Sequence, residues 1–204
     1  MRPVDRCIGL CSLAVLVCLS GGCGGSQYGT PEATSLAAKS ALERGDYRAF
    51  CHCLTTEARD EMAAGLVMLG GFMQLGADGQ GPEAERARVR ARKIKAVLER
   101  HGLNEQTTPK MSISLVAGKE EQKRAMLKLV EPIKDRDALI ADFIRVLIEA
   151  SDEPDARLVN LRTGTDTATA TFAQTRQGKE KTSPIEFKKV EGEWKISELP
   201  RLML

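Results

Sequence analysis

The period of the hydrophobic pattern changes near Pro154, and this change constrains the fold more than any other feature. Before it, apolar residues recur at helical spacing, as they do between Leu139 and Leu147. After it, apolar and polar residues alternate, and glycine-containing turns divide the chain into an antiparallel meander of about four strands. Helices followed by strands predict an α+β fold with helices on one sheet face. The expected strands are 158–161, 167–174, 183–190 and 193–199.

The first helices have clear boundary signals. Thr30 is placed to cap a helix that starts at Pro31, and Gly45 ends it. Asp46 is placed to cap a short helix over 47–54, and Thr55 or Thr56 a third one. Small residues at helical spacing form one face of the first helix: Ala33, Leu36, Ala37, Ser40 and Ala41.

The third helix contains an uncharged run from Ala63 to Gly76. A run of this length is more typical of a buried core helix than of a membrane span, which needs about 20 apolar residues. Further helices are expected at 83–101, 120–130 and 135–150, with a strand at 111–116.

The first 22 residues are typical of a cleaved export signal. Arg2 and Arg6 precede an apolar segment over 7–19, and small residues precede Cys23. This arrangement resembles a bacterial lipoprotein signal, although Ser20 stands where the usual box has leucine. The resemblance implies that Cys23 is lipidated and anchors the protein to a membrane of the cell envelope, on the periplasmic side. The alternatives are ordinary cleavage near Gly22 and an uncleaved anchor.

This interpretation divides the chain into three parts. They are a signal peptide over 1–22, a flexible tether over 23–30 and a single α+β domain over 31–204. Removing the signal peptide leaves a nearly neutral chain, and aromatic residues make up only 4% of the sequence. Neither property favours nucleic acid as a partner.

Two segments resemble one known family. The N-terminal region is similar to the opening helices of nuclear-transport-factor-two-like (SnoaL-like) lipoproteins. The similarity lies in the order of three segments: Thr30-Pro31-Glu32-Ala33, 41–47 and 54–59. The segment 190–196 resembles the last hairpin of that superfamily. The resemblance implies N-terminal helices packed on a curved antiparallel sheet, forming a cone whose mouth can hold a ligand. The long middle, about 62–154, is then a helical insertion.

Enzymes of this superfamily use a carboxylate or histidine inside the cone as a general base. No residue here matches such a catalytic position. Asp166, Glu186, His52 and His101 lack an active-site context, and His101 is explained by its place at a helix C-terminus. We therefore predict no catalytic residue and no cofactor.

The fourth helix is strongly basic, with six cations at Arg86, Arg88, Arg90, Arg92, Lys93 and Lys95. Such a helix can lie on anionic lipid headgroups, which a tethered domain would meet. The alternative is a solvated face, with charge pairing to nearby glutamates.

Cys51-His52-Cys53 suggests a metal or redox site, since thiolates and imidazole bind soft metals. On a helix, however, residues two apart point in nearly opposite directions. We predict no metal and interpret the cysteines as small buried side chains. A bond to a partner protein is the remaining alternative.

Trp194 is interpreted as a core anchor of the last strand, with a ligand-cavity role as the alternative. Met62, Met68 and Met73 are expected to fill the core. Together these features predict a membrane-tethered, non-enzymatic binding or interaction module of the cell envelope. Its partner would be a small apolar ligand, an envelope protein or a second copy docked on the open sheet face. The alternative is a small-molecule-binding protein or SnoaL-like enzyme that uses the cone cavity.

Overall fold

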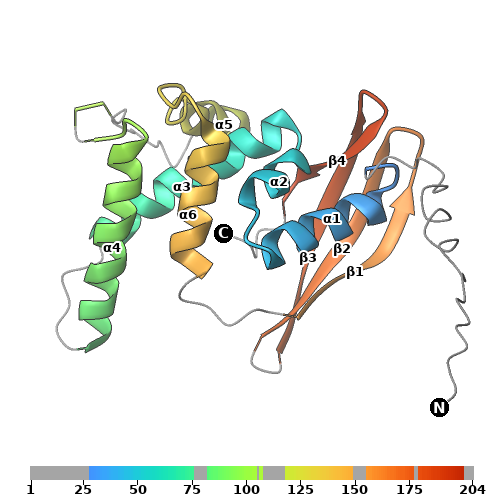
Figure 1. Ribbon diagram of the computed structural model, residues 1–204. Coiled ribbons are helices and arrows are strands. Elements are labelled where there is room, and N and C mark those ends of the chain that lie inside the picture. The colour runs from blue at the N-terminus through green and yellow to red at the C-terminus, as the bar shows by residue number, and fades with distance from the viewer. Residues whose placement is uncertain are drawn as a thin grey trace, which may run out of the picture.

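The computed structural model describes residues 28–75, 82–104, 106–107, 118–148, 155–176 and 179–199. Within them the helices come first and the strands last, which confirms the predicted α+β class (Figure 1). The helices are α1 (Pro31–Glu43), α2 (Tyr47–His52), α3 (Thr56–Leu75), α4 (Pro82–Arg100), α5 (Lys119–Leu127) and α6 (Arg136–Ile148). The strands are β1 (Asp155–Thr163), β2 (Thr167–Arg176), β3 (Lys179–Val190) and β4 (Glu193–Glu198).

The four strands form one antiparallel sheet in the order β1-β2-β3-β4, as the alternating pattern predicts. Glu191 and Gly192 join β3 to β4, and both have positive φ angles, of 52° and 87°. Two such residues in a row are what a tight two-residue hairpin requires. The edge strand β1 has an irregular register between Val159 and Arg162, where Asn160 also has a positive φ of 57°.

Helix α1 lies across one face of the sheet (Figure 1). Thr30 caps it, because its hydroxyl accepts a hydrogen bond of 3.1 Å from the Ala33 amide. The face that α1 buries is Thr34, Ala38 and Ala41, whereas Leu36 is 68% exposed. Of the expected face, Ala41 is buried, Ala33, Ala37 and Ser40 are half-buried, and only Leu36 is exposed. The buried Thr34 hydroxyl donates to the Trp194 carbonyl at 2.8 Å, and this bond fixes which side of α1 meets β4.

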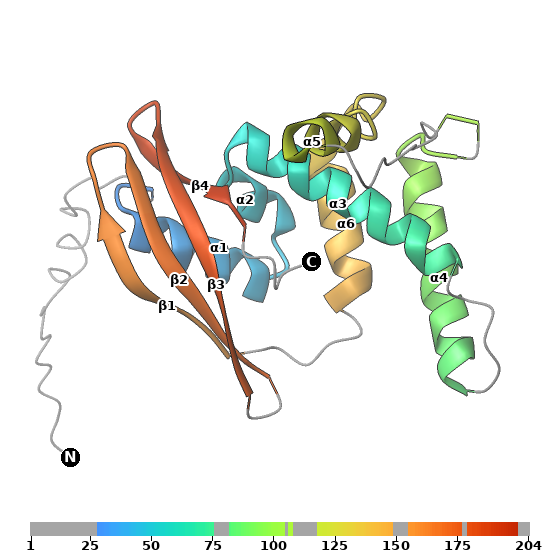
Figure 2. The ribbon, with the colours of Figure 1, turned by 180° about the vertical axis from the view of Figure 1, so that it is seen from behind.

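Helices α3, α4 and α6 pack on one another beside the sheet, and α5 contacts α3. Helix α4 lies at the end of the molecule farthest from the sheet in both views (Figures 1 and 2). A close crossing joins the three helices at Gly70. A Cβ atom added there would lie 3.0 Å from atoms of Ile94 and Phe143 and 3.2 Å from Leu98. A side chain at this position would displace these neighbours by a few tenths of an ångström, so glycine permits the close approach.

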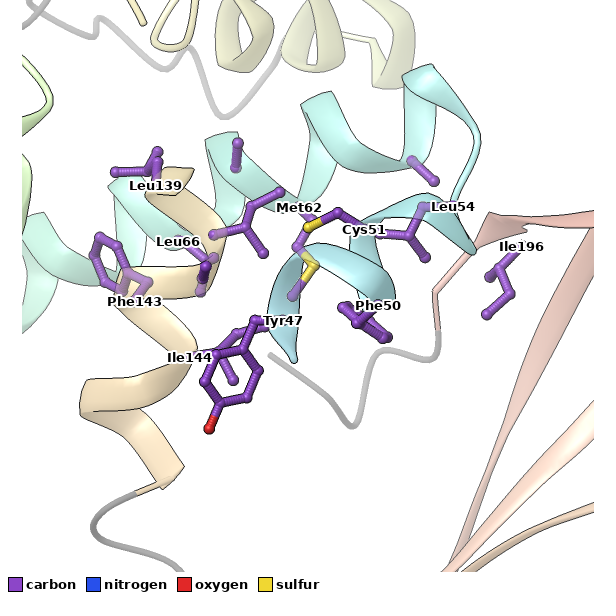
Figure 3. Close-up of a cluster of buried hydrophobic side chains, with 14 of the residues drawn as sticks. Tyr47, Phe50, Cys51, Leu54, Met62, Leu66, Leu139, Phe143, Ile144 and Ile196 are labelled. Atoms are coloured by element: carbon purple, nitrogen blue, oxygen red, sulfur yellow. The ribbon is translucent and has the colours of Figure 1, made fainter. Parts of the chain in front are cut away.

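Helix α2 connects the helices to the sheet. Figure 3 shows Tyr47 beside Ile144 of α6 and Cys51 near Met62 of α3, with Leu54, which follows α2, on the side of Ile196 of β4. The Leu54 backbone pairs with Ile196, so the end of α2 also covers the free edge of β4. A single hydrophobic core thus runs from the helices to the sheet.

The predicted helices are confirmed with shifted ends. The second helix stops at His52 instead of residue 54, and the fifth covers Lys119–Leu127. Among the described residues, no helix is both long and apolar enough to cross a bilayer. The expected strand at 111–116, the signal peptide and Cys23 lie outside the described residues.

Candidate functional site

The chain enters the described fold at Tyr28, five residues after Cys23. The Tyr28 carbonyl accepts a hydrogen bond of 2.8 Å from the Trp194 amide of β4. Its ring lies under the Lys195 ammonium, 4.0 Å from Nζ to the ring centroid. Its side chain hydrogen-bonds that of Cys53. We call Tyr28, Cys53, Trp194 and Lys195 the Tyr28 junction; through it, the chain just before α1 is joined to β4.

The chemistry of the junction is that of a structural contact. Burial raises the pKa of the Cys53 thiol to about 11, against the lowering effects of Lys195 and of the hydrogen bond from Tyr28. Lys195 is held by Glu193 at 2.8 Å and donates to the His52 carbonyl at 3.0 Å. A thiol with this pKa is protonated near neutral pH, so Cys53 is a poor nucleophile and a poor metal ligand.

Cys51 is equally unsuited to metal or redox chemistry. Burial first, and then the charge of Asp137, raises its pKa to about 12. Both cysteines are buried free thiols, as interpreted from the sequence, whereas His52 between them is exposed. The described residues contain no group of three histidines, cysteines or carboxylates placed to hold a metal ion.

A second polar cluster joins α4 to α6 around Asp142. One carboxylate oxygen accepts from Arg100 Nη1 at 2.9 Å and meets His101 Nε2 at 3.1 Å, and the other accepts from Arg145 Nη1 at 3.1 Å. Burial alone would raise the pKa of Asp142, but the hydrogen bonds from His101 and Arg100 outweigh it and lower the pKa. We call Asp142, Arg100, His101 and Arg145 the Asp142 cluster.

A shallow hollow of about 260 Å³ opens beside this cluster, between the start of α2 and α6. The Arg145 guanidinium lies 5.9 Å from the centroid of the Tyr47 ring, and Arg48 bonds to Asp135 at 2.8 Å. The volume of the hollow is below the range that is usual for ligand sites, about 300–1,000 Å³. Its lining residues are Gly45, Asp46, Tyr47, Arg48, Ala138, Ala141, Asp142 and Arg145.

The predicted basic helix is α4, with seven lysines and arginines against three glutamates. Its outward residues include Arg86, Arg92 and Lys93, which are exposed, and Val89, which is 44% exposed. Two pairs match the predicted local charge pairing: Arg88–Glu85 at 3.3 Å and Lys95–Glu99 at 3.8 Å. Arg90 is half-buried, and contact of α4 with lipid stays a prediction.

The other predicted residues are dispersed. Trp194 is 5% exposed and belongs to the core, in agreement with its interpretation as an anchor, and it does not line the hollow near Asp142. Met62 is buried, and Met68 and Met73 pack partly buried against the core. Asp166 and Glu186 are exposed.

The sheet face opposite α1 is polar. Thr169, Glu186 and Lys188 are exposed on it, while Ala170 and Phe187 are buried on the inner face. This differs from the apolar patch that docking on the open sheet would require.

The sequence did not single out Tyr28 or Asp142. Tyr28 lies next to the small residues of the expected tether, and Asp142 lies beside the apolar stripe of its helix. Cys53 lies 25 residues after Tyr28, and Arg100 lies 42 residues before Asp142, so no local spacing connects these partners. No protein-family model, curated protein or solved structure matches this chain.

Proposed function

We propose that this chain is a lipid-anchored protein of the bacterial cell envelope, held by acyl chains on Cys23, whose α+β domain is a non-enzymatic binding or interaction module. The observation that carries the proposal is the Tyr28 junction. Tyr28, five residues after Cys23, is bonded to β4 through the Trp194 amide. Cleavage before Cys23 would leave the junction intact, and acylation would hold the domain close to the bilayer.

The finer fold proposal is a nuclear-transport-factor-two-like domain with a helical insertion. Three observations support it: three N-terminal helices in succession, α1 lying across one sheet face, and a final hairpin that carries a buried tryptophan. The competing function is a ligand-binding or SnoaL-like enzyme that uses the interior of the cone.

The packing between α1 and the sheet favours an interaction module over an enzyme. Phe172, Phe187, Trp194 and Ile196 are buried there, and Thr34 already bonds to a backbone carbonyl. A general base needs a titratable side chain that can approach a substrate proton. The buried polar residues among the described positions are Thr34, Thr55 and Ser183, none of which titrates near neutral pH.

The anchor is tested by replacing Cys23 with serine in the full chain. We expect loss of the acyl label and release of the protein from the membrane fraction, because the acyl chains supply the binding energy. Cys18→Ser is the matched control: it changes a cysteine within the signal peptide and should leave label and fractionation unchanged. Membrane partition that persists in Cys23→Ser, together with no acyl label on the wild type, would refute the proposal.

A further inference from the structure

The linker between Cys23 and Tyr28 is short. Its five residues span at most about 18 Å even when fully extended. Its far end does not move freely, because the Tyr28 carbonyl is bonded to β4 and the ring is held beneath Lys195. An anchor on Cys23 therefore restrains the orientation of the domain as well as its location.

From this restraint we infer that the end of the sheet at the β3–β4 turn faces the anchoring bilayer and that the basic outer face of α4 points away from it. The inference rests on the proposed lipidation of Cys23. It reverses the expectation that α4 lies on lipid headgroups, and it leaves the basic face of α4 open to the aqueous side.

Helix α3 provides the length scale. At its start, the Thr55 amide bonds to the Ile196 carbonyl of β4 at 2.9 Å. Fifteen residues later, Gly70 lies against Ile94 of α4. At 1.5 Å per residue this separation is about 22 Å, and the width of α4 adds about 10 Å before its outer face is reached.

The outer face of α4 is thus on the order of 30 Å from β4, farther than the linker extends. Both views place α4 and the sheet at opposite ends of the molecule (Figures 1 and 2). A bilayer lying across the far end of the molecule, perpendicular to the direction from β4 to α4, would be too distant from Tyr28 for a lipidated Cys23 to be embedded in it.

The end of the sheet at the β3–β4 turn lies close enough to Tyr28 for the linker to reach a bilayer there. Val190 is 38% exposed and pairs with Glu193, which adjoins Trp194 of the Tyr28 junction. Charges of both signs surround it: Lys188 and Lys189 on β3, and Glu191 and Glu193 at the turn. This mixture gives no strong attraction to anionic lipid, so the linker itself must set the orientation.

The two exposed valines, Val190 and Val89, allow a direct test. Single variants Val190→Cys and Val89→Cys of the lipidated full chain are labelled with a fluorophore and placed in vesicles that carry a headgroup quencher. The native Cys51 and Cys53 are buried, with thiol pKa values of about 12 and 11, so they remain unlabelled at neutral pH. We expect several-fold stronger quenching at position 190 than at position 89. Equal quenching, or stronger quenching at position 89, would overturn the inference.

A longer linker is the control for the mechanism. Inserting a Gly-Ser spacer of about 20 residues after Ser26 lets the domain turn freely, so the difference between the two positions should disappear. A difference that survives the insertion contradicts orientation by the linker. Glu191→Cys and Ala96→Cys, both at exposed positions, form a second labelled pair in case a valine variant folds poorly.

Changing the lipid charge distinguishes contact through α4 from contact through the β3–β4 turn. If α4 bound headgroups, quenching at position 89 would rise in anionic vesicles and fall with added salt. We expect no such response. If the lipidation proposal is wrong, the result differs from a wrong orientation, because the wild type would then carry no acyl label and bind no vesicle. An acylated, vesicle-bound protein with the reversed quenching pattern would refute only the orientation.

Discussion

The sheet layer (α1 and β1–β4) and the helical layer (α3–α6) differ in how their parts are joined. In the sheet layer the joining contacts are mainly backbone hydrogen bonds and buried apolar side chains, with the Thr34–Trp194 bond between helix and strand. In the helical layer, ion pairs link separate helices: Arg100–Asp142, Arg136–Asp60 and Arg59–Asp137.

This difference indicates which layer is more sensitive to salt and pH. Ion pairs between partly exposed side chains weaken with salt and with protonation of the carboxylate. Backbone hydrogen bonds in a sheet do not titrate. We therefore expect acid and salt to loosen the contacts of the helical layer before those of the sheet layer.

The largest expected effect tests whether the two layers unfold separately. Phe143→Ala in the helical layer and Phe187→Ala in the sheet each remove a fully buried ring and should cost about 3–5 kcal/mol. Because α2 side chains join the layers, we expect one transition in urea for each variant (Figure 3).

The chain offers two probes for this measurement. Trp194 is its only tryptophan and reports on the sheet layer by fluorescence, whereas circular dichroism reports mainly on the helices. If Phe143→Ala shifted the dichroism midpoint and left the fluorescence midpoint unchanged, the layers would be independent units.

A middle-sized effect is expected from Asp142→Asn, which removes the carboxylate that joins α4 to α6. We expect a loss of about 2 kcal/mol near neutral pH, reduced at high salt. The pKa of Asp142 is lower in the folded state than in the unfolded state. Its contribution to stability is therefore present above the unfolded value, about 3.9, and is lost as the pH falls through the folded one.

Urea unfolding at several pH values measures this contribution. The wild type should lose stability in acid more steeply than Asp142→Asn does. Thr34→Val in the sheet layer is the control, with a loss of about 1 kcal/mol that is independent of pH and salt. Equal acid slopes in the wild type and Asp142→Asn would show that Asp142 does not contribute.

The smallest effect concerns two adjacent glycines of α3. In Gly70→Ala the new methyl group meets Ile94, Phe143 and Leu98, and the crowding should outweigh the gain in helix propensity by about 1 kcal/mol. In Gly71→Ala no atom lies within 4 Å of the new Cβ, so only the propensity gain remains. Opposite shifts in melting temperature are expected, and a stabilised Gly70→Ala would mean that the helices can separate at little cost.

Local sequence signals were sufficient to predict which segments form helices and which form strands. Thr30 and Asp46 cap the helices they were expected to cap, and Glu191-Gly192 forms the expected turn. Side-chain direction was less predictable. Leu36 belongs to an apolar stripe, but it is exposed, because α1 presents Thr34, which bonds to β4, to the sheet. A bond over 160 positions leaves no trace in the spacing of neighbouring residues.

The sequence by itself determined the order of helices and strands and the candidate anchor at Cys23, because periodicity, caps and signal patterns are local. It favoured Cys51 and Cys53 as buried side chains, and the tertiary structure buries both thiols. Only the tertiary structure decided that Tyr28 is fixed to β4, that Asp142 joins two helices, and that α4 lies far from the linker. These contacts depend on how helices pack in three dimensions, and that packing brings together residues that no sequence spacing relates.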